Sequence, residues 1–221
     1  MTLKQPPTKV RRRRSPADAR TEILAGGEQF LRTHPWHELT IDKVMACTTL
    51  SRPSFYVHFT DRLNLLVQLG AEVSATLSER SDRASWLSGQ GSPYAIARGA
   101  LEGLVALYAE HGTLIKAVVE ASYHEDVIKT GRLEVEERFS SATASRIADE
   151  IAAGRAPACD ARRLAEALTL LTEATLVRWF GGKPQVKQQE AVETLLQIWS
   201  GAIYGCTPAE LKTRWPEAAA G

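Results

Sequence analysis

The sequence lacks the features on which disulfide-rich, zinc-binding and membrane-spanning proteins depend. Its three cysteines, Cys47, Cys159 and Cys206, lie far apart and form no C-x-x-C pair, which argues against a disulfide scaffold or a zinc site. No apolar run reaches the roughly 18 residues of a membrane span. No apolar segment follows the N-terminal arginines, as it would in a secretory signal. We therefore expect a cytoplasmic protein with reduced thiols and no membrane partner.

The motifs of common enzyme classes are absent as well. The sequence contains no G-x-S-x-G, Walker or G-x-G-x-x-G motif. The alternative of an enzyme with metal or general-base chemistry rests on four histidines, His34, His37, His111 and His124. His34 and His37 have no carboxylate at ligand spacing, and His124 precedes acidic residues that suit a helix start. We expect no catalytic residue, no metal and no cofactor.

The residues that are present follow a helical pattern. Apolar positions recur at helical spacing, alternation of period two is missing, and Gly and Pro separate the apolar stretches. After the first 60 residues we expect helices at about 61–85, 94–110, 114–122, 127–153, 160–180 and 188–204, with His111-Gly112 ending the second of them. The predicted fold is therefore all-α, with about nine helices in total.

Residues 40–66 have the pattern of a helix-turn-helix unit. Thr40 can cap a first helix, which has apolar residues at i, i+3 and i+4. After a short turn Ser51 can cap a second helix, and Pro53 falls in its first turn, where a missing N–H costs nothing. Asp61 then caps a long following helix. In such a unit the N-terminal part of the second helix enters a major groove of DNA.

The second helix also has one apolar and one polar side. Phe55 and Phe59 are spaced to anchor it to its neighbours. A helix this short is not stable alone, so its packing holds an exposed polar surface in place. That surface is formed by Ser51, Arg52, Ser54, Tyr56 and His58. Such side chains are suited to reach base edges and phosphates.

Charge is distributed unevenly along the chain. Residues 1–63 hold 11 Lys and Arg against 6 Asp and Glu, whereas the remainder holds 16 against 20. The run Arg11-Arg12-Arg13-Arg14 lies in a segment too polar and Pro-rich to order itself. An arginine arm before a helix-turn-helix can reach phosphates or a narrow minor groove. The alternative is a solvated tail that only aids solubility.

The run LSRPSFYVHF at 50–59, followed by Asp61-Arg62 and Leu65-Leu66, resembles the DNA-binding segment of TetR-family transcriptional repressors. The stretches 168–176 and 198–205 are similar to the ethionamide-repressor subfamily. Two positions depart from the family pattern: Thr49 replaces the usual turn glycine, and Arg62 replaces the usual lysine. The resemblance implies an N-terminal three-helix helix-turn-helix domain and a C-terminal helical domain for ligand binding and dimerisation.

The resemblance also divides the chain into four parts. We expect a disordered basic arm at 1–16, a DNA-binding domain at 17–63, an effector-binding and dimerisation domain at 64–205, and a C-terminal tail at 206–221. The expected function is a ligand-responsive repressor that binds double-stranded palindromic operator DNA and is released by a small hydrophobic effector. The alternative is an all-helical ligand-binding protein with weak or no DNA binding.

Individual roles follow for the DNA-binding residues. We expect Tyr56 and His58 to contact phosphates and bases, and Ser54 and Arg52 to contact base edges or phosphate. Pro53 would meet a thymine methyl group. Thr40 and Arg62 would hold backbone phosphates, although capping alone is an alternative for Thr40. The complete predicted set is Thr40, Ser51, Arg52, Pro53, Ser54, Tyr56, His58 and Arg62.

The C-terminal domain is predicted to form a pocket and a dimer interface. An apolar cavity with aromatics and a few hydroxyls suits a hydrophobic effector. Similarity to the ethionamide repressors and residue type give as ligand-binding residues Leu104, Tyr108, Phe139, Thr143, Thr169, Thr172, Glu173, Trp179 and Trp199. Core filling is the alternative for each. The last two predicted helices are expected to form a homodimer, because two helix-turn-helix units read two half-sites.

Overall fold

The computed structural model describes residues 15–83 and 91–216, and over these residues it contains nine α-helices, one 3-10 helix and no strand. The all-α prediction is confirmed. In chain order the elements are α1 (Pro16–Leu31), η1 (Trp36–Glu38), α2 (Ile41–Ala46), α3 (Arg52–His58), α4 (Arg62–Arg83), α5 (Pro93–Ser122), α6 (Asp126–Ala152), α7 (Ala161–Phe180), α8 (Gln188–Tyr204) and α9 (Pro208–Arg214). No helix within the described ranges is long and apolar enough to cross a bilayer.

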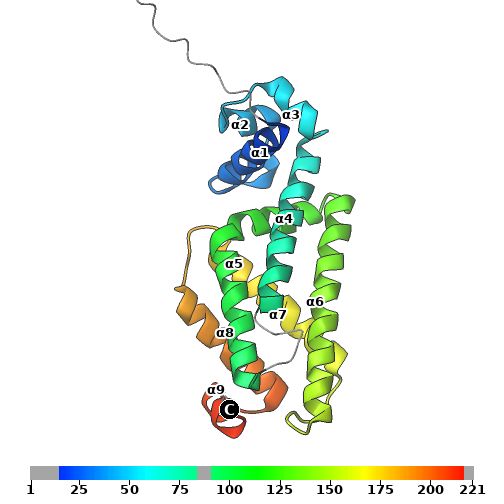
Figure 1. Cartoon of the computed structure of the whole chain (residues 1–221), viewed down its shortest axis with the longest axis vertical. Coiled ribbons are helices and arrows are strands. Elements are labelled where there is room, and N and C mark those ends of the chain that lie inside the picture. The colour runs from blue at the N-terminus through cyan, green and yellow to red at the C-terminus, as the bar shows by residue number, and fades with distance from the viewer. Residues whose placement is uncertain (1–14, 84–90, 217–221) are drawn as a thin grey trace, which may run out of the picture.

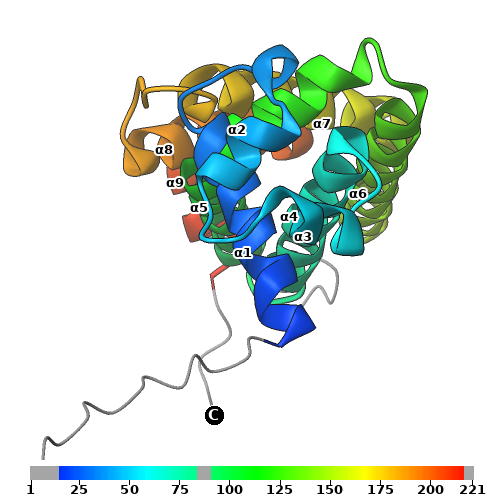
Figure 2. The ribbon, with the colours of Figure 1, turned by 90° about the horizontal axis from the view of Figure 1, so that it is seen from above.

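The first three helices form a small unit at one end of the elongated molecule (Figure 1). Figure 2 shows this unit from above, where α1, α2 and α3 lie over the upper ends of the longer helices. Its core is continuous with the rest of the protein. The buried cluster joins Ile23 of α1 and Phe55 of α3 to Leu65 of α4, Leu114 of α5 and Ile128 of α6. The N-terminal unit therefore rests on α4 and α5 through shared apolar packing.

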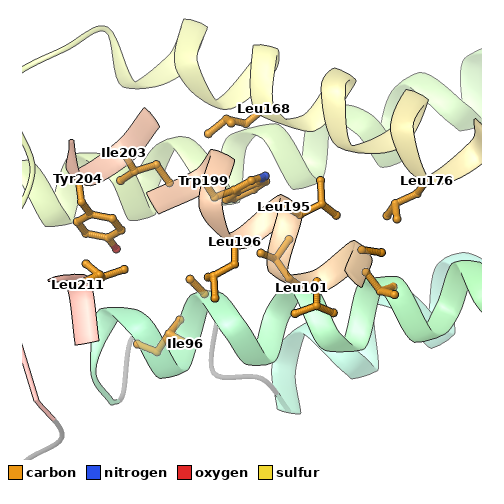
Figure 3. Packing of buried hydrophobic residues seen from close by; sticks show 14 of the residues in the cluster. Ile96, Leu101, Leu168, Leu176, Leu195, Leu196, Trp199, Ile203, Tyr204 and Leu211 are labelled. Carbon is orange, nitrogen blue, oxygen red and sulfur yellow. The ribbon is translucent and has the colours of Figure 1, made fainter. Parts of the chain in front are cut away.

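A second apolar cluster fills the larger part of the molecule. Helix α5 lies at its centre and packs against α4, α6, α7, α8 and α9. Figure 3 shows Ile96 and Leu101 of α5 facing side chains of α8, with Leu168 and Leu176 of α7 on the opposite side. Leu176, Leu195 and Leu211 are fully buried. Each such side chain contributes roughly 1.5–3 kcal/mol by leaving water, so this cluster is the main stabilising core.

The prediction that one helix ends at His111-Gly112 and another begins at Leu114 is wrong. The helix runs without interruption from Pro93 to Ser122. Gly112 is buried, and a Cβ built on it would lie 2.3 Å from the carbonyl oxygen of Phe180. The glycine therefore permits close contact between α5 and the end of α7 rather than ending a helix. The sequence shows a glycine but not the neighbouring backbone that requires it.

Both described ends of the chain are more ordered than we predicted. The arm was expected to include residues 15 and 16, but Ser15 caps α1 through reciprocal bonds with Asp18, at 3.2 Å and 3.1 Å. The predicted tail contains α9, which begins with a capping box between Thr207 and Glu210 and buries Leu211. The arginine run of the arm, and residues 84–85 of the predicted fourth helix, lie outside the described ranges.

Candidate nucleic-acid interface and ligand pocket

The turn between α2 and α3 is held by side-chain hydrogen bonds. Thr40 caps α2 by accepting the N–H of Lys43 at 3.3 Å. The hydroxyl of Thr48 donates to the Met45 carbonyl at 2.9 Å and accepts the N–H of Leu50 at 3.2 Å. Threonine at 49, where the family pattern has glycine, donates its N–H and its hydroxyl to a carboxylate oxygen of Glu22, at 2.6 Å each. The turn is therefore tied to α1 as well as to its own helices.

Helix α3 has the two-sided surface that the sequence predicts. Phe55 and Phe59 are buried with their ring centroids 5.4 Å apart, and they anchor the helix to the N-terminal unit. On the other side Tyr56 is 51% exposed and Val57 is 75% exposed. The predicted contact residues Ser51, Arg52 and Pro53 are exposed, whereas Ser54 and His58 are half-buried. All of them share one short helix and its cap at the outer end of the molecule (Figure 1).

An acidic side chain lies on this surface and was not among the predicted contact residues. One Arg52 nitrogen, Nη1, donates to both carboxylate oxygens of Asp42, at 2.8 Å and 2.9 Å. A second, Nη2, donates to the Tyr56 hydroxyl at 3.4 Å. The hydrogen bond to Tyr56, followed by the charge of Asp42, raises the pKa of the Arg52 guanidinium. The sequence places Asp42 in the first turn of α2, but only the crossing of α2 and α3 brings it to Arg52.

Arg62 makes contacts within the protein that the sequence does not predict. Its Nη1 donates to the Leu39 carbonyl at 3.0 Å, and its guanidinium carbon lies 5.0 Å from the centre of the Trp36 ring. Because the side chain is half-buried, it joins the start of α4 to the segment before α2. Asp61 caps α4, as predicted, by accepting the N–H of Asn64 at 2.8 Å.

A cavity of about 320 Å³ lies between α4, α5 and α6, with Glu173 of α7 in its wall. Most of the lining is apolar. The α4 side includes Leu66, Gly70 and Leu77, and the α5 side includes Leu107 and Tyr108. Its volume falls in the range of small-molecule sites. The residues of α6 in the wall include exposed ones, whereas α4 and α5 pack closely together. The cavity therefore opens between α4 and α6.

The structure places only two of the nine predicted ligand residues, Tyr108 and Glu173, in the wall of this cavity. Thr172 instead accepts a hydrogen bond from the Trp199 indole at 3.1 Å, and both residues are buried in the core. Thr143 is also buried, and the four half-buried ones are Leu104, Phe139, Thr169 and Trp179. The contribution of α4 was missed, because its residues read as an ordinary apolar stripe. The small residues at 70, 71 and 74, which interrupt that stripe, were the available signal.

Charged groups in the cavity wall come from α6 and α7. Arg132 donates through Nη2 and Nε to the two carboxylate oxygens of Glu173, at 2.8 Å and 3.2 Å. It also donates through Nη1 to Glu136 at 3.3 Å. Burial, followed by the nearby Glu173 carboxylate, raises the pKa of the Tyr108 phenol. At neutral pH the cavity thus contains a neutral phenol next to a charge-paired arginine.

Two of the four histidines behind the enzyme alternative make contacts within the protein. His34 stacks on Phe30 at 4.3 Å between ring centroids. His111 lies on α5, and its Nδ1 is 2.8 Å from a Glu28 carboxylate oxygen of α1. Within the described ranges, no group of three or more His, Cys, Asp or Glu side chains is arranged to hold a metal ion.

Comparison with known proteins identifies the relatives of this chain. The family model described as "Transcriptional regulator EthR, C-terminal domain" matches residues 97–205. The HTH-type transcriptional regulator EthR of Mycolicibacterium smegmatis is 28% identical over 193 residues, which cover 86% of this chain and 88% of the relative. EthR of Mycobacterium tuberculosis is 29% identical over 208 residues, with 85% and 88% coverage. These matches confirm the resemblance that the sequence motifs predicted.

Solved structures share the fold. A TetR-like transcriptional regulator from Rhodococcus sp. RHA1 superposes with a TM-score of 0.70 at 19% identity, covering 86% of this chain and 98% of its own. The regulatory protein TetR from Rhodobacter sphaeroides gives a TM-score of 0.64 at 20% identity, with coverage of 85% and 97%. At these identities the likeness concerns the fold alone. It confirms the arrangement of a helix-turn-helix unit on a larger helical domain.

Proposed function

We propose that this chain, a TetR-family transcriptional regulator resembling EthR, is a repressor. A small hydrophobic effector would release it from its operator. The observation that carries the proposal is the exposed polar side of α3 at the outer end of the molecule. Buried Phe55 and Phe59 fix that side in place. A fixed, projecting helix is what entry into a major groove requires. As a regulator of transcription it would act in the cytoplasm.

The proposed DNA contacts are those of the sequence prediction. Tyr56 is 51% exposed on α3, and the exposed start of the helix carries Ser51, Arg52 and Pro53. Thr40 and Arg62 are proposed to approach backbone phosphates. The present bond of Arg62 to Leu39 uses one of its five N–H donors, so others are available for a phosphate oxygen.

A dimer is proposed to form through α7 and α8. On α7, Leu171 is 40% exposed, and Ala167 and Ala174 lie on the same side at spacings of four and three residues. On α8, Gly201 and Ala202 are exposed. Small and apolar residues permit close approach of two helices. Two copies related by a two-fold axis would present their α3 helices to two half-sites, which gives a specificity that one unit lacks.

The cavity suggests how an effector would act. Residues of α4 line it, and only three residues separate the end of α3 from the start of α4. An effector that binds one position of α4 better than another would shift the spacing of the two α3 helices in the dimer. Operator affinity would fall once the two helices no longer fit successive major grooves.

The experiment that tests the proposal is DNA protection by the purified full chain on promoter fragments of its own genome, at low and physiological salt. We expect protection of a palindromic site by a dimer at nanomolar concentration. Failure to protect any fragment at low salt would overturn the proposal. It would favour the alternative of an all-helical ligand-binding protein without DNA binding.

A further inference from the structure

The charges around the cavity are unbalanced, and this imbalance bears on the class of effector. Three charged side chains line the wall, Arg132, Glu134 and Glu173. Glu136, one turn along α6, lies within hydrogen-bond distance of Arg132. The local set therefore holds one cation and three carboxylates, beside walls that are otherwise mostly apolar.

Arg132 has no charge to spare for an anionic ligand. Its guanidinium is held by Glu173 through two hydrogen bonds and by Glu136 through a third. The side chains of Arg132 and Glu173 are only 21% and 22% exposed. An acidic ligand would have to displace one of these carboxylates from a half-buried position. It would also meet the negative charge that remains, and like charges in a poorly solvated site repel strongly.

Unlike Arg132, Glu134 is not engaged by another charged side chain within residues 15–83 and 91–216. Its side chain is exposed on α6 in the wall of the cavity, and among the described residues no hydrogen bond or ion pair engages it. The carboxylate is therefore available to a ligand. Tyr108 is also in the wall and is neutral, and an aromatic ring near a ligand favours a cation over an anion.

We propose that the effector is a lipophilic cation, such as an alkylammonium compound, whose charged head lies beside Glu134. Its apolar part packs against the walls from α4 and α5. The volume of about 320 Å³ is that of about ten waters at roughly 30 Å³ each, which suits a chain of eight to ten carbons. The inference rests on the proposed function, because it names the chemistry of the effector that acts at the same cavity.

The first test compares three probes with the same alkyl chain, below their micelle concentrations: decyltrimethylammonium, decanol and decanoate. Titration calorimetry on the full chain measures the affinity of each. We expect decyltrimethylammonium to bind at least tenfold more tightly than decanol, and decanoate to bind most weakly. Equal affinities would overturn the inference, since they would mean that the alkyl chain alone governs recognition. Tightest binding of decanoate would also overturn it, since it would mean that Arg132 binds the head group.

Variants test whether the head group lies at the proposed place. Glu134→Gln should weaken decyltrimethylammonium at least fivefold and leave decanol unchanged, because only the charge is removed. Glu120→Gln is the matched control, since it removes a surface carboxylate of α5 that is outside the cavity wall. Gly131→Trp should weaken all the probes, because a Cβ at 131 meets nothing within 4 Å and the indole would occupy the wall. An unchanged ammonium affinity in Glu134→Gln would refute the assignment.

Measurements of operator binding distinguish failure of the cationic effector from failure of the proposed regulatory function. If decanol or decanoate releases the operator as well as the ammonium probe does, the regulatory function stands and the cationic effector is wrong. If the protein without probe does not bind any operator, the proposed function itself fails, whatever the cavity binds.

Discussion

Asp42 and Arg52 place opposite charges side by side on the surface that we propose faces DNA. The two side chains are 68% and 54% exposed, so their ion pair contributes little to stability. Its importance is for recognition. The Asp42 carboxylate occupies Arg52 and repels phosphate, so a DNA site must supply a better partner than Asp42. At the scale of single residues, this pair would select against DNA that does not present such a partner.

The variant Asp42→Asn tests that role. Removing the charge frees Arg52, so we expect affinity for unrelated DNA to rise by about tenfold and the salt dependence to steepen by roughly one phosphate contact per subunit. Fluorescence anisotropy on operator and scrambled duplexes over a salt series measures both quantities. Weaker binding to the operator alone would show instead that Asp42 orients Arg52 toward a base.

Tyr56 is the residue whose loss should affect binding most. Tyr56→Ala should reduce operator affinity by a hundredfold or more, from about 1–3 kcal/mol in each of two subunits. The free energy of unfolding should change by only about 0.5 kcal/mol, since the side chain is half exposed. Tyr123→Ala is the matched control, because that tyrosine is 76% exposed on the loop between α5 and α6. Unchanged operator affinity in Tyr56→Ala would contradict the assignment.

At the scale of elements, helix α5 organises the larger domain. It spans 30 residues, contacts every other helix of that domain, and forms one side of the cavity. Its close packing against the end of α7 depends on Gly112, because a Cβ there would collide with the Phe180 carbonyl oxygen. A single glycine thus has a packing role inside a helix, despite the lower helix propensity of glycine.

Two alanine substitutions distinguish a glycine that is needed for close packing from one that only weakens its helix. Gly112→Ala should lower the free energy of unfolding by about 1–3 kcal/mol, because its Cβ would collide with the Phe180 carbonyl and force the helices apart. Gly131→Ala on α6 meets nothing within 4 Å and should raise stability by about 0.5–1 kcal/mol. Urea unfolding measures both. A neutral Gly112→Ala would mean that α7 moves away at little cost.

At the scale of the whole molecule, two apolar clusters link the proposed DNA-binding helix, the cavity and the proposed dimer interface. One joins α1–α3 to the upper parts of α4 and α5, and the other holds α5 against α7, α8 and α9. The cavity is walled by α4, α5 and α6, with Glu173 of α7. Under the proposed function, a displacement of α4 would reach α3 through the side chains that the two helices share in one cluster. Helices α7 and α8 would stay in place as the proposed dimer interface.

The dimer can be tested with one charge. Leu171→Glu should convert the protein to a monomer and weaken operator binding at least a hundredfold, because two half-sites would no longer be read together. Sedimentation velocity measures the assembly state, and circular dichroism checks that each subunit stays folded. Tyr123→Glu places the same charge on an exposed residue outside the proposed interface. A dimeric Leu171→Glu would rule out this face of α7.

The sequence by itself determined the all-α class, the helix-turn-helix segment and the anchoring of α3 by Phe55 and Phe59, because these depend on local spacing, capping and periodicity. Only the tertiary structure decided that α5 passes through Gly112, that Asp42 holds Arg52, and that the cavity lies against α4 rather than beside Thr172 and Trp199. Those features depend on contacts between residues distant in the chain. Helical periodicity shows which side of a helix is buried, but not which neighbour it meets.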